Sequence, residues 1–159
     1  MIELNIPGRG LIQLEHLVSD INGTIALDGH LLEGVPRLIT ELQDRLEVHL
    51  LSADTHGCQS QIERKLNLKM VRIQPGGEQD QKAAYIEKIG AQKVIAFGQG
   101  ANDAAMLKKA VIGICILSAE GAAVETLNSA DLVVPDIRTA FQLIQKPVRL
   151  VASLSLIHI

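Results

Sequence analysis

Short apolar stretches alternate with longer amphipathic ones along most of the chain. The apolar stretches end at glycine or polar residues, which is typical of buried strands. Between them apolar residues recur at helical spacing, as at Leu38, Ile39 and Leu42. Strands are expected at residues 11–20, 48–52, 70–74, 93–98, 111–117 and 131–136. Helices are expected at residues 35–46, 55–68, 78–90, 102–110, 119–130 and 137–146.

Two segments carry hairpin signals. MIELNI alternates apolar and polar residues, PGRG supplies a turn, and the strand pattern then resumes as far as Asp20. In TIALDGHLLEG, the pair Asp28-Gly29 separates two short apolar runs, which indicates a short flap hairpin. Pro36 in the first turn of one predicted helix and Gly90 at the end of another support their boundaries.

The alternation of strands and helices predicts an α/β fold. Right-handed crossovers would build a Rossmann-like, three-layer structure with a central parallel sheet and helices on both faces. Sites in such folds lie beyond the carboxyl ends of the strands. Three of the expected strands end in polar clusters. These clusters are Asp20-Ile21-Asn22, Ser52-Ala53-Asp54 and the segment 98–103. We expect these clusters to converge.

Composition narrows the class of protein. The 159 residues suit one domain spanning 1–159, and the hydrophobic content of 47% supports a folded core. A net charge of −3 without a basic block argues against nucleic-acid binding, and 2% aromatic residues argue against base stacking. We find no signal peptide and no apolar run long enough for a membrane span, so we expect a cytoplasmic protein. Cys58 and Cys115 lack metal-ligand spacing and are interpreted as free buried thiols.

The clustered residue types suit phosphoryl transfer. Asp20, at a strand end, can act as an anionic nucleophile, and the hydroxyl of Ser52 can donate to a phosphoryl oxygen. Mg²⁺ prefers oxygen ligands, for which Asp20, Asp103 and a carbonyl near Asn22 are candidates. The glycines of GQG let backbone amides approach an anion. Lys82, near the start of its predicted helix, is the best candidate for neutralising charge.

Each motif taken singly has a plainer interpretation. Asp20 followed by Asn-Gly is compatible with a simple turn, and Ser52 with a turn or a helix N-cap. Lys82 is compatible with a solvated helix lysine, and GQGAND with a tight turn capped by Asn102 or Asp103. The histidines share no ligand spacing and are interpreted as surface or strand residues. Among them, only His56 lies near the predicted site. The five histidines are His16, His30, His49, His56 and His158.

Four motifs in order resemble the haloacid dehalogenase superfamily. DINGT resembles its first signature, LLSAD its second, and Lys82 falls where its third-signature lysine is expected. GQGANDAAML resembles the fourth, in a form typical of P-type ATPase phosphorylation domains and their soluble relatives. The resemblance covers residues 14–147 and implies the family fold. It assigns Asp20, Asn22 and Lys82 to catalysis, and phosphate binding to Ser52, Ala53, Lys82 and Asn102. It assigns the metal to Asp20, Asn22, Gln99 and Asp103.

Two positions depart from the family pattern. Asn22 stands where hydrolytic members carry an acidic general acid and base, and an amide cannot exchange that proton. Gln99 stands where the family usually has a metal-binding aspartate, so we expect weaker metal affinity. Asp54 is a further candidate to help hold the metal.

The family's usual cap domain has no counterpart between Asp20 and Ser52, where the chain has room for a flap hairpin and one helix. Capless relatives commonly enclose substrate with a neighbouring subunit or act on macromolecules. The resemblance therefore implies a homo-oligomer, such as a tetramer, and a phosphorylated small molecule or macromolecule as partner. The apolar tail RLVASLSLIHI is a candidate interface.

These features lead to two hypotheses and a minor third. The first is an enzyme, a Mg²⁺-dependent phosphatase or phosphotransferase that works through an aspartyl phosphate on Asp20 and is slowed by Asn22 and Gln99. The second is a catalytically weak or inactive module that binds phosphate and metal or serves assembly. The third is a nucleotide-binding regulatory domain, which would require adenine contacts that the sequence does not reveal.

Overall fold

The computed structural model describes residues 1–53, 57 and 59–157. Within this part of the chain, six strands form one parallel sheet in the order β10-β9-β8-β3-β6-β7. Their bounds are β3 His16–Asp20, β6 Glu47–Ser52, β7 Val71–Arg72, β8 Val94–Gly98, β9 Ile112–Ile116 and β10 Leu132–Val134. The chain leaves β3 toward β6 and β7, then crosses back to β8. The order therefore reverses between β3 and β8, where α/β sheets place their ligands.

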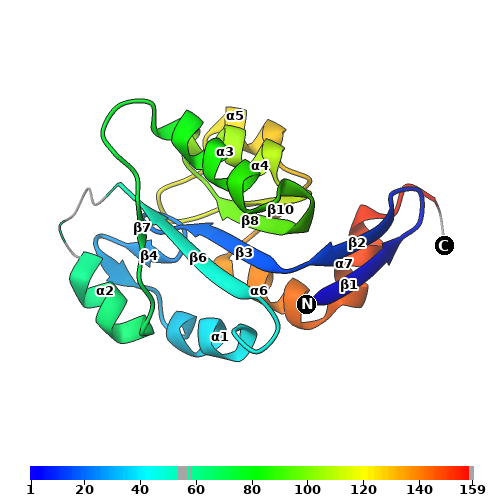
Figure 1. Ribbon diagram of the computed structural model, residues 1–159, viewed down its shortest axis with the longest axis horizontal. Helices are drawn as coiled ribbons and strands as arrows, with labels where there is room; N and C mark the ends of the chain where they lie inside the picture. Colours follow the sequence, from blue (N-terminus) through cyan, green and yellow to red (C-terminus); the bar gives the residue numbers. More distant parts are fainter. Residues whose placement is uncertain (54–56, 58, 158–159) are drawn as a thin grey trace.

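Helices cover both faces of this sheet and make the three predicted layers (Figure 1). On one face lie α3 Glu78–Ile89, α4 Ala104–Lys109 and α5 Val124–Ser129. On the other lie α1 Val35–Leu42, α2 Gln59–Leu66 and α6 Ile137–Gln145. Phe97 of β8 and Phe141 of α6 pack edge to face between the sheet and the helices of this second face. Their ring centroids are 5.5 Å apart. The predicted α/β class is confirmed.

Both predicted hairpins are present. β1 Ile2–Ile6 pairs with β2 Gly10–Leu14, and the short flap pairs β4 Ala26–Leu27 with β5 His30–Leu31. Asp28 and Gly29, which connect the flap strands, both have positive φ, as a tight hairpin turn requires. The first hairpin differs from expectation in one respect. The strand predicted over 11–20 is divided at Glu15, because its first half pairs with β1 and its second half enters the central sheet.

Helix α1 ends at Leu42, four residues before its predicted end, and two further helices differ from their predicted bounds. The helix expected at 119–130 begins only at Val124, because Ser118 and Gly121 form a turn closed by a backbone hydrogen bond of 2.9 Å. The helix expected at 102–110 is divided into the 3₁₀ turn η2 Ala101–Asp103 and α4. A second 3₁₀ turn, η1 Ala91–Lys93, follows the predicted cap at Gly90, whose φ of 106° is left-handed.

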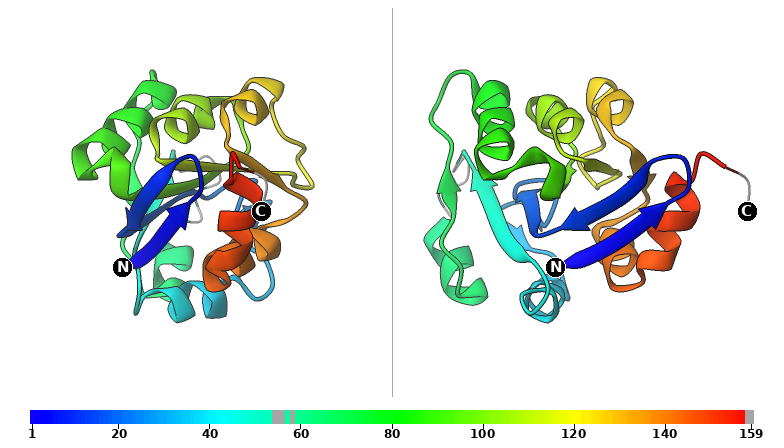
Figure 2. Two further views of the ribbon diagram at one scale, coloured as in Figure 1. Left: turned by 90° about the vertical axis from the view of Figure 1, so that its right-hand side faces the viewer. Right: turned by 45° about the vertical axis from the view of Figure 1, so that its right-hand side comes forward.

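The apolar tail packs within the chain. It forms α7 Pro147–Leu154, which lies beside β1 and buries Leu150 and Leu154 (Figures 1 and 2). The backbone N–H of Leu156 donates to the carbonyl of Pro7 at 2.9 Å, which ties the tail to the hairpin turn. Leu150 and Leu154 of the suggested interface are therefore used inside one molecule, whereas Leu156 and Ile157 are exposed. Among the described residues, no helix is long and apolar enough to cross a membrane.

Candidate active site

Asp20 is the last residue of β3 and lies between the ends of β6 and β8, where the strand order reverses. Its side chain is largely buried, and the residue is 9% exposed. Lys82 Nζ donates to Asp20 Oδ1 at 2.8 Å, and Thr24 Oγ1 donates to Oδ2 at 3.2 Å. Thr24 was absent from the predicted site residues, although its place in DINGT was a signal that could have identified it. The carboxylate of Asp20 is thus held at both oxygens.

The segment after Asp20 is a tight turn, as the plainer interpretation of DINGT predicted. The carbonyl of Ile21 accepts hydrogen bonds from the three successive amides of residues 24–26, at 3.1, 3.0 and 3.0 Å. Gly23 has a φ of 81°, which favours glycine. A Cβ at this position would also lie 1.9 Å from Gln99 Nε2. The turn therefore lets the Gln99 side chain approach the backbone of the loop after Asp20.

Lys82 reaches the site from α3 and is 1% exposed, so it is no solvated helix lysine. Its ammonium donates to Asp103 Oδ1 at 2.7 Å, to Asp20 Oδ1 at 2.8 Å and to Asn102 Oδ1 at 3.1 Å. Three acceptors match the three donors of an ammonium group. Burial acts to lower the pKa of Lys82, but the nearby carboxylates of Asp20 and Asp103 outweigh it and raise that pKa. Lys82 is therefore charged at neutral pH.

Asp103 is fully buried in η2, at the start of the α4 segment. Its Oδ2 accepts hydrogen bonds from the backbone amides of Gln99 at 3.0 Å and Gly100 at 3.1 Å. Gly98 makes room for it, because a Cβ at position 98 would lie 2.6 Å from the Cβ of Asp103. The expectation that the GQG amides face an external anion was wrong for these two amides. They bind Asp103, whose side chain folds back over the turn.

Two carboxylates and one ammonium share this buried site. Burial, and then the negative charge of Asp103, raise the pKa of Asp20 to about 7, although Lys82 and Thr24 oppose the shift. With all three groups ionised, two negative charges and one positive charge leave one negative charge uncompensated. A divalent cation with oxygen ligands would remove this repulsion. The donor set thus fits Mg²⁺, with Asp20 and Asp103 as charged ligands and Asn22 and Gln99 as neutral candidates.

Other predicted site residues that the structure describes lie at or just after the ends of neighbouring strands. Ser52 is buried at the end of β6, whose Leu51 is in register with Asp20, and Ala53 follows it. Asn102 is exposed and reaches the cluster through Lys82. Three residues of the sequence-based predictions lie outside the described residues: the proposed helper Asp54, the thiol of Cys58, and His56, which was expected near the site.

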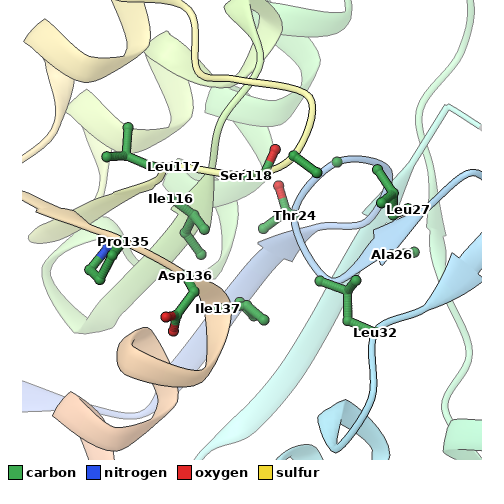
Figure 3. Close-up of a pocket in the computed structure, with 12 residues that line it drawn as sticks. Thr24, Ala26, Leu27, Leu32, Ile116, Leu117, Ser118, Pro135, Asp136 and Ile137 are labelled. Atoms are coloured by element: carbon green, nitrogen blue, oxygen red, sulfur yellow. The ribbon is translucent and has the colours of Figure 1, made fainter.

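A cavity of about 240 Å³ lies beside the flap hairpin (Figure 3). Its lining is mostly apolar and comes from the flap, from the segment after β9 and from the start of α6, with Leu27, Leu117 and Ile137 among its residues. Thr24 belongs to both regions, because it lines the cavity and also bonds Asp20. Ile137 of α6 also lines the cavity, whereas Lys82 and Asp103 come from α3 and η2 and are not among its lining residues.

Two other sequence interpretations can be compared with the structure. Cys115 is a free buried thiol on β9, as expected. His16 and His49 are strand residues, as expected. The pairing of β3 with β6 brings them together, with His16 Nδ1 3.1 Å from His49 Nε2.

Comparison with known proteins adds to this geometry. A sequence model of haloacid dehalogenase-like hydrolases matches residues 81–137. An uncharacterised protein of Methanocaldococcus jannaschii, MJ0073, is 38% identical over 90 residues, which are 54% of this chain and 97% of that protein. A probable copper-exporting P-type ATPase of Archaeoglobus fulgidus is 33% identical over 135 residues, 79% of this chain. The chain corresponds to only 16% of that transporter's length.

Solved structures share the fold. The 3-deoxy-D-manno-octulosonate 8-phosphate phosphatase of Moraxella catarrhalis, solved with a magnesium ion, a phosphate ion and the sugar acid, superposes with a TM-score of 0.63. It is 14% identical, and the match covers 84% of this chain and 86% of that one. The sheet order, the buried Asp20–Lys82–Asp103 cluster, the family match and these relatives agree: the chain belongs to the haloacid dehalogenase superfamily of hydrolase folds.

Proposed function

We propose that this protein is a Mg²⁺-dependent phosphatase or phosphotransferase that forms an aspartyl phosphate on Asp20. The observation that carries the proposal is the buried contact of Lys82 Nζ with both Asp20 and Asp103, at 2.8 and 2.7 Å. Asp20 ends β3, where the strand order of the sheet reverses. A buried carboxylate with a raised pKa, next to a charged lysine, is typical of a catalytic centre.

In the proposed reaction a carboxylate oxygen of Asp20 attacks phosphorus, an Asp20–phosphoryl bond forms, and the bond from phosphorus to the leaving oxygen breaks. Lys82, fixed by three acceptors, offers positive charge where negative charge gathers on the phosphoryl oxygens. We expect the Ser52 hydroxyl, at the end of β6, and the Asn102 amide, in η2, to donate to the same oxygens. Thr24 and Lys82 hold the Asp20 carboxylate in place before reaction.

Bound Mg²⁺ would supply neutralisation of the phosphoryl charge, with Asp20, Asp103 and oxygens of Asn22 and Gln99 to hold it. The magnesium-bound phosphatase of M. catarrhalis with the same fold supports this choice of ion. Because Gln99 replaces a metal-binding aspartate, we expect a modest affinity.

The second step, attack of water on the aspartyl phosphate, is expected to be slow. Asn22 is two residues after the nucleophile, where a general base would deprotonate the water, and its amide cannot accept that proton. The product of the first step would therefore accumulate. This fits a chain that is 33% identical to part of a P-type ATPase.

The test is direct detection of the intermediate. The protein is incubated with MgCl₂ and a small aryl phosphate, and intact-protein mass spectrometry follows a hydroxylamine-sensitive phosphoryl adduct. We expect the adduct in the wild type and in Asp44→Asn, a control at an exposed carboxylate, and its loss in Asp20→Asn. An adduct that survives in Asp20→Asn would refute the assignment of the nucleophile.

A second candidate is a phosphate- and metal-binding module without turnover. It is favoured by the amides of Gln99 and Gly100, which are engaged by Asp103 and so do not face a ligand. Titration of Mg²⁺ with and without beryllium fluoride separates the two candidates. Binding of the phosphate mimic without any adduct from the aryl phosphate would favour the module.

A further inference from the structure

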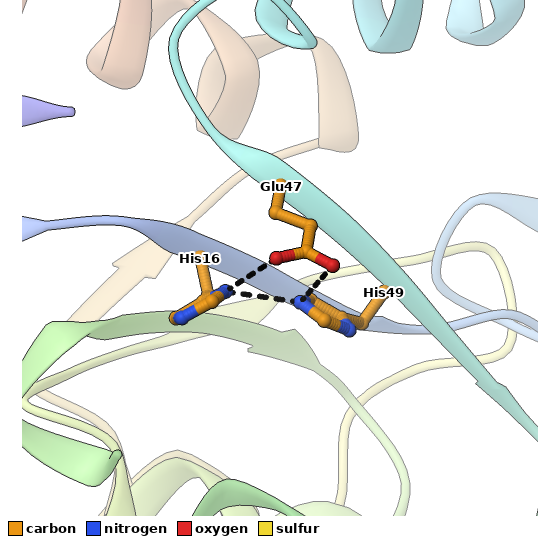
Figure 4. A group of neighbouring side chains, drawn as sticks. All are labelled: His16, Glu47 and His49. Carbon is orange, nitrogen blue, oxygen red and sulfur yellow. Dashed lines mark hydrogen bonds and ion pairs between the residues drawn. The ribbon is translucent and has the colours of Figure 1, made fainter. Parts of the chain in front are cut away.

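A second polar cluster lies at the opposite end of β3 from Asp20. His16 begins β3, and Glu47 and His49 lie on the adjacent strand β6, with Glu47 directly across from His16 in the parallel register. Figure 4 shows the three side chains turned toward one another over the two strands. His16 is four residues before Asp20, so the two clusters are about 13 Å apart along the strand. The cluster is therefore separate from the proposed active site.

We propose that His16, His49 and Glu47 form a binding site for a transition-metal dication of the Zn²⁺ class. His16 Nδ1 and His49 Nε2 are 3.1 Å apart. Two nitrogens bound tetrahedrally to zinc at about 2.0–2.1 Å are separated by about 3.3 Å. The two imidazoles thus stand at the spacing that one ion requires, within a few tenths of an ångström.

The carboxylate of Glu47 completes the set of three ligands. Its Oε2 is 3.5 Å from His16 Nδ1, and its Oε1 is 3.9 Å from His49 Nε2. One ligand atom from each residue lies within 4.8 Å of the others. Two imidazoles and one carboxylate are the donors that Zn²⁺, Co²⁺ and Ni²⁺ accept readily, whereas Mg²⁺ prefers oxygen alone. The Glu47 side chain is 69% exposed, which leaves an open side for a water ligand.

A neighbouring hydrogen bond orients one imidazole for this role. His49 Nδ1 is 2.8 Å from the phenol oxygen of Tyr85 on α3. If His49 binds a metal through Nε2, its proton must be on Nδ1, from which it donates to Tyr85. Such a partner on the second ring nitrogen is typical of metal-bound histidine, because it fixes both tautomer and ring orientation. The side chains of His16 and His49 are 15% and 11% exposed, so packing restricts both rings before any ion binds.

The test is calorimetric titration of the whole chain with ZnCl₂ in excess MgCl₂, which keeps oxygen-ligand sites occupied. We expect saturation at one equivalent, and at least tenfold weaker binding in His16→Gln and in His49→Gln. His30→Gln, at an exposed histidine of β5, is the matched control and should bind like the wild type. Equal affinity in His16→Gln and His30→Gln, or no saturable binding, would overturn the proposal.

Two further measurements keep the test decisive if a histidine variant fails to fold. Glu47→Gln changes an exposed side chain and should also weaken Zn²⁺ binding, without altering the circular dichroism spectrum of the metal-free protein. Tyr85→Phe removes the orienting hydroxyl and should weaken binding by less than loss of either histidine does. Co²⁺ should give the visible d–d absorption of a four-coordinate ion in the wild type and lose it in Glu47→Gln. Unchanged absorption in that variant would refute the assigned ligand set.

Discussion

β3 carries a polar cluster at each end, and the two clusters are built in opposite ways. At its carboxyl end, Asp20 shares a buried site with Lys82 and Asp103, three groups that carry formal charges. At its amino end, His16 meets His49 and the exposed Glu47. The first cluster comes from motifs distributed along 84 positions from Asp20 to Asp103. The second depends on the register of two neighbouring strands.

The difference concerns how charge is tolerated. A buried carboxylate needs a partner, because desolvation of an unpaired ion costs several kcal/mol. This cost is comparable to the net free energy of unfolding of a whole domain. Lys82 therefore stabilises the first cluster even without metal. Neutral imidazoles need no such partner, so the second cluster can persist without an ion and remain ready to bind one. Four changes test this contrast, in order of decreasing effect.

Lys82→Met should have the largest effect. It leaves Asp20 and Asp103 buried without a cation, which should lower the free energy of unfolding by about 3–5 kcal/mol at pH 7.5. Urea unfolding measures the change. Lys88→Met, at an exposed lysine of the same helix, is the control and should change stability by less than about 0.5 kcal/mol. Similar losses in both variants would mean that the buried ammonium is not the cause.

Asn22→Asp should restore the missing proton acceptor. The aspartyl phosphate should then hydrolyse about a hundredfold faster, the lower end of what a positioned general base contributes. The decay of the phosphoryl adduct after removal of donor measures this rate. Asn128→Asp, at an exposed residue of α5, serves as the control. If the phosphoryl adduct of Asn22→Asp decays no faster than that of this control, the residue at position 22 does not activate water.

Asp20→Asn should stabilise the metal-free protein at pH 8. The folded-state pKa of Asp20, about 7, exceeds its unfolded value of 3.8. The folded state therefore holds the extra proton between these values, and the contribution of this group to stability falls as pH rises from about 4 to 7. Removing the charge should gain about 1–2 kcal/mol, or roughly 2–8 °C in Tm, at pH 8 and less at pH 5. Thermal unfolding in EDTA, with Asp44→Asn beside it, checks this sign, and a gain that is larger at pH 5 would contradict it.

Glu47→Gln should have the smallest effect on the metal-free protein. Its side chain is 69% exposed, and exposed ion pairs contribute little, so the free energy of unfolding should change by less than about 0.5 kcal/mol. Urea unfolding in EDTA measures it. A larger loss would show that the second cluster, like the first, depends on charge pairing without an ion.

Most of the fold could be predicted because its signals are local. The buried strand before Asp20, the Asp28-Gly29 turn and the cap at Gly90 each follow from a few neighbouring residues. The candidate site could be predicted as far as its ordered motifs extend, since strand ends in a parallel sheet meet at one edge. The helix over 119–130 was too long because the turn between Ser118 and Gly121 depends on a hydrogen bond that apolar periodicity does not reveal.

From the sequence alone follow the α/β class, the position of Asp20 and the loss of an acid at position 22. Tertiary structure decides which charges pair: Lys82 bridges Asp20 and Asp103, and the amides beside Gly98 bind Asp103. It also decides that His16 meets His49, across 33 positions of sequence. The physical reason is that hydrophobic periodicity is set within one element, whereas strand register and crossovers bring distant side chains within bonding distance.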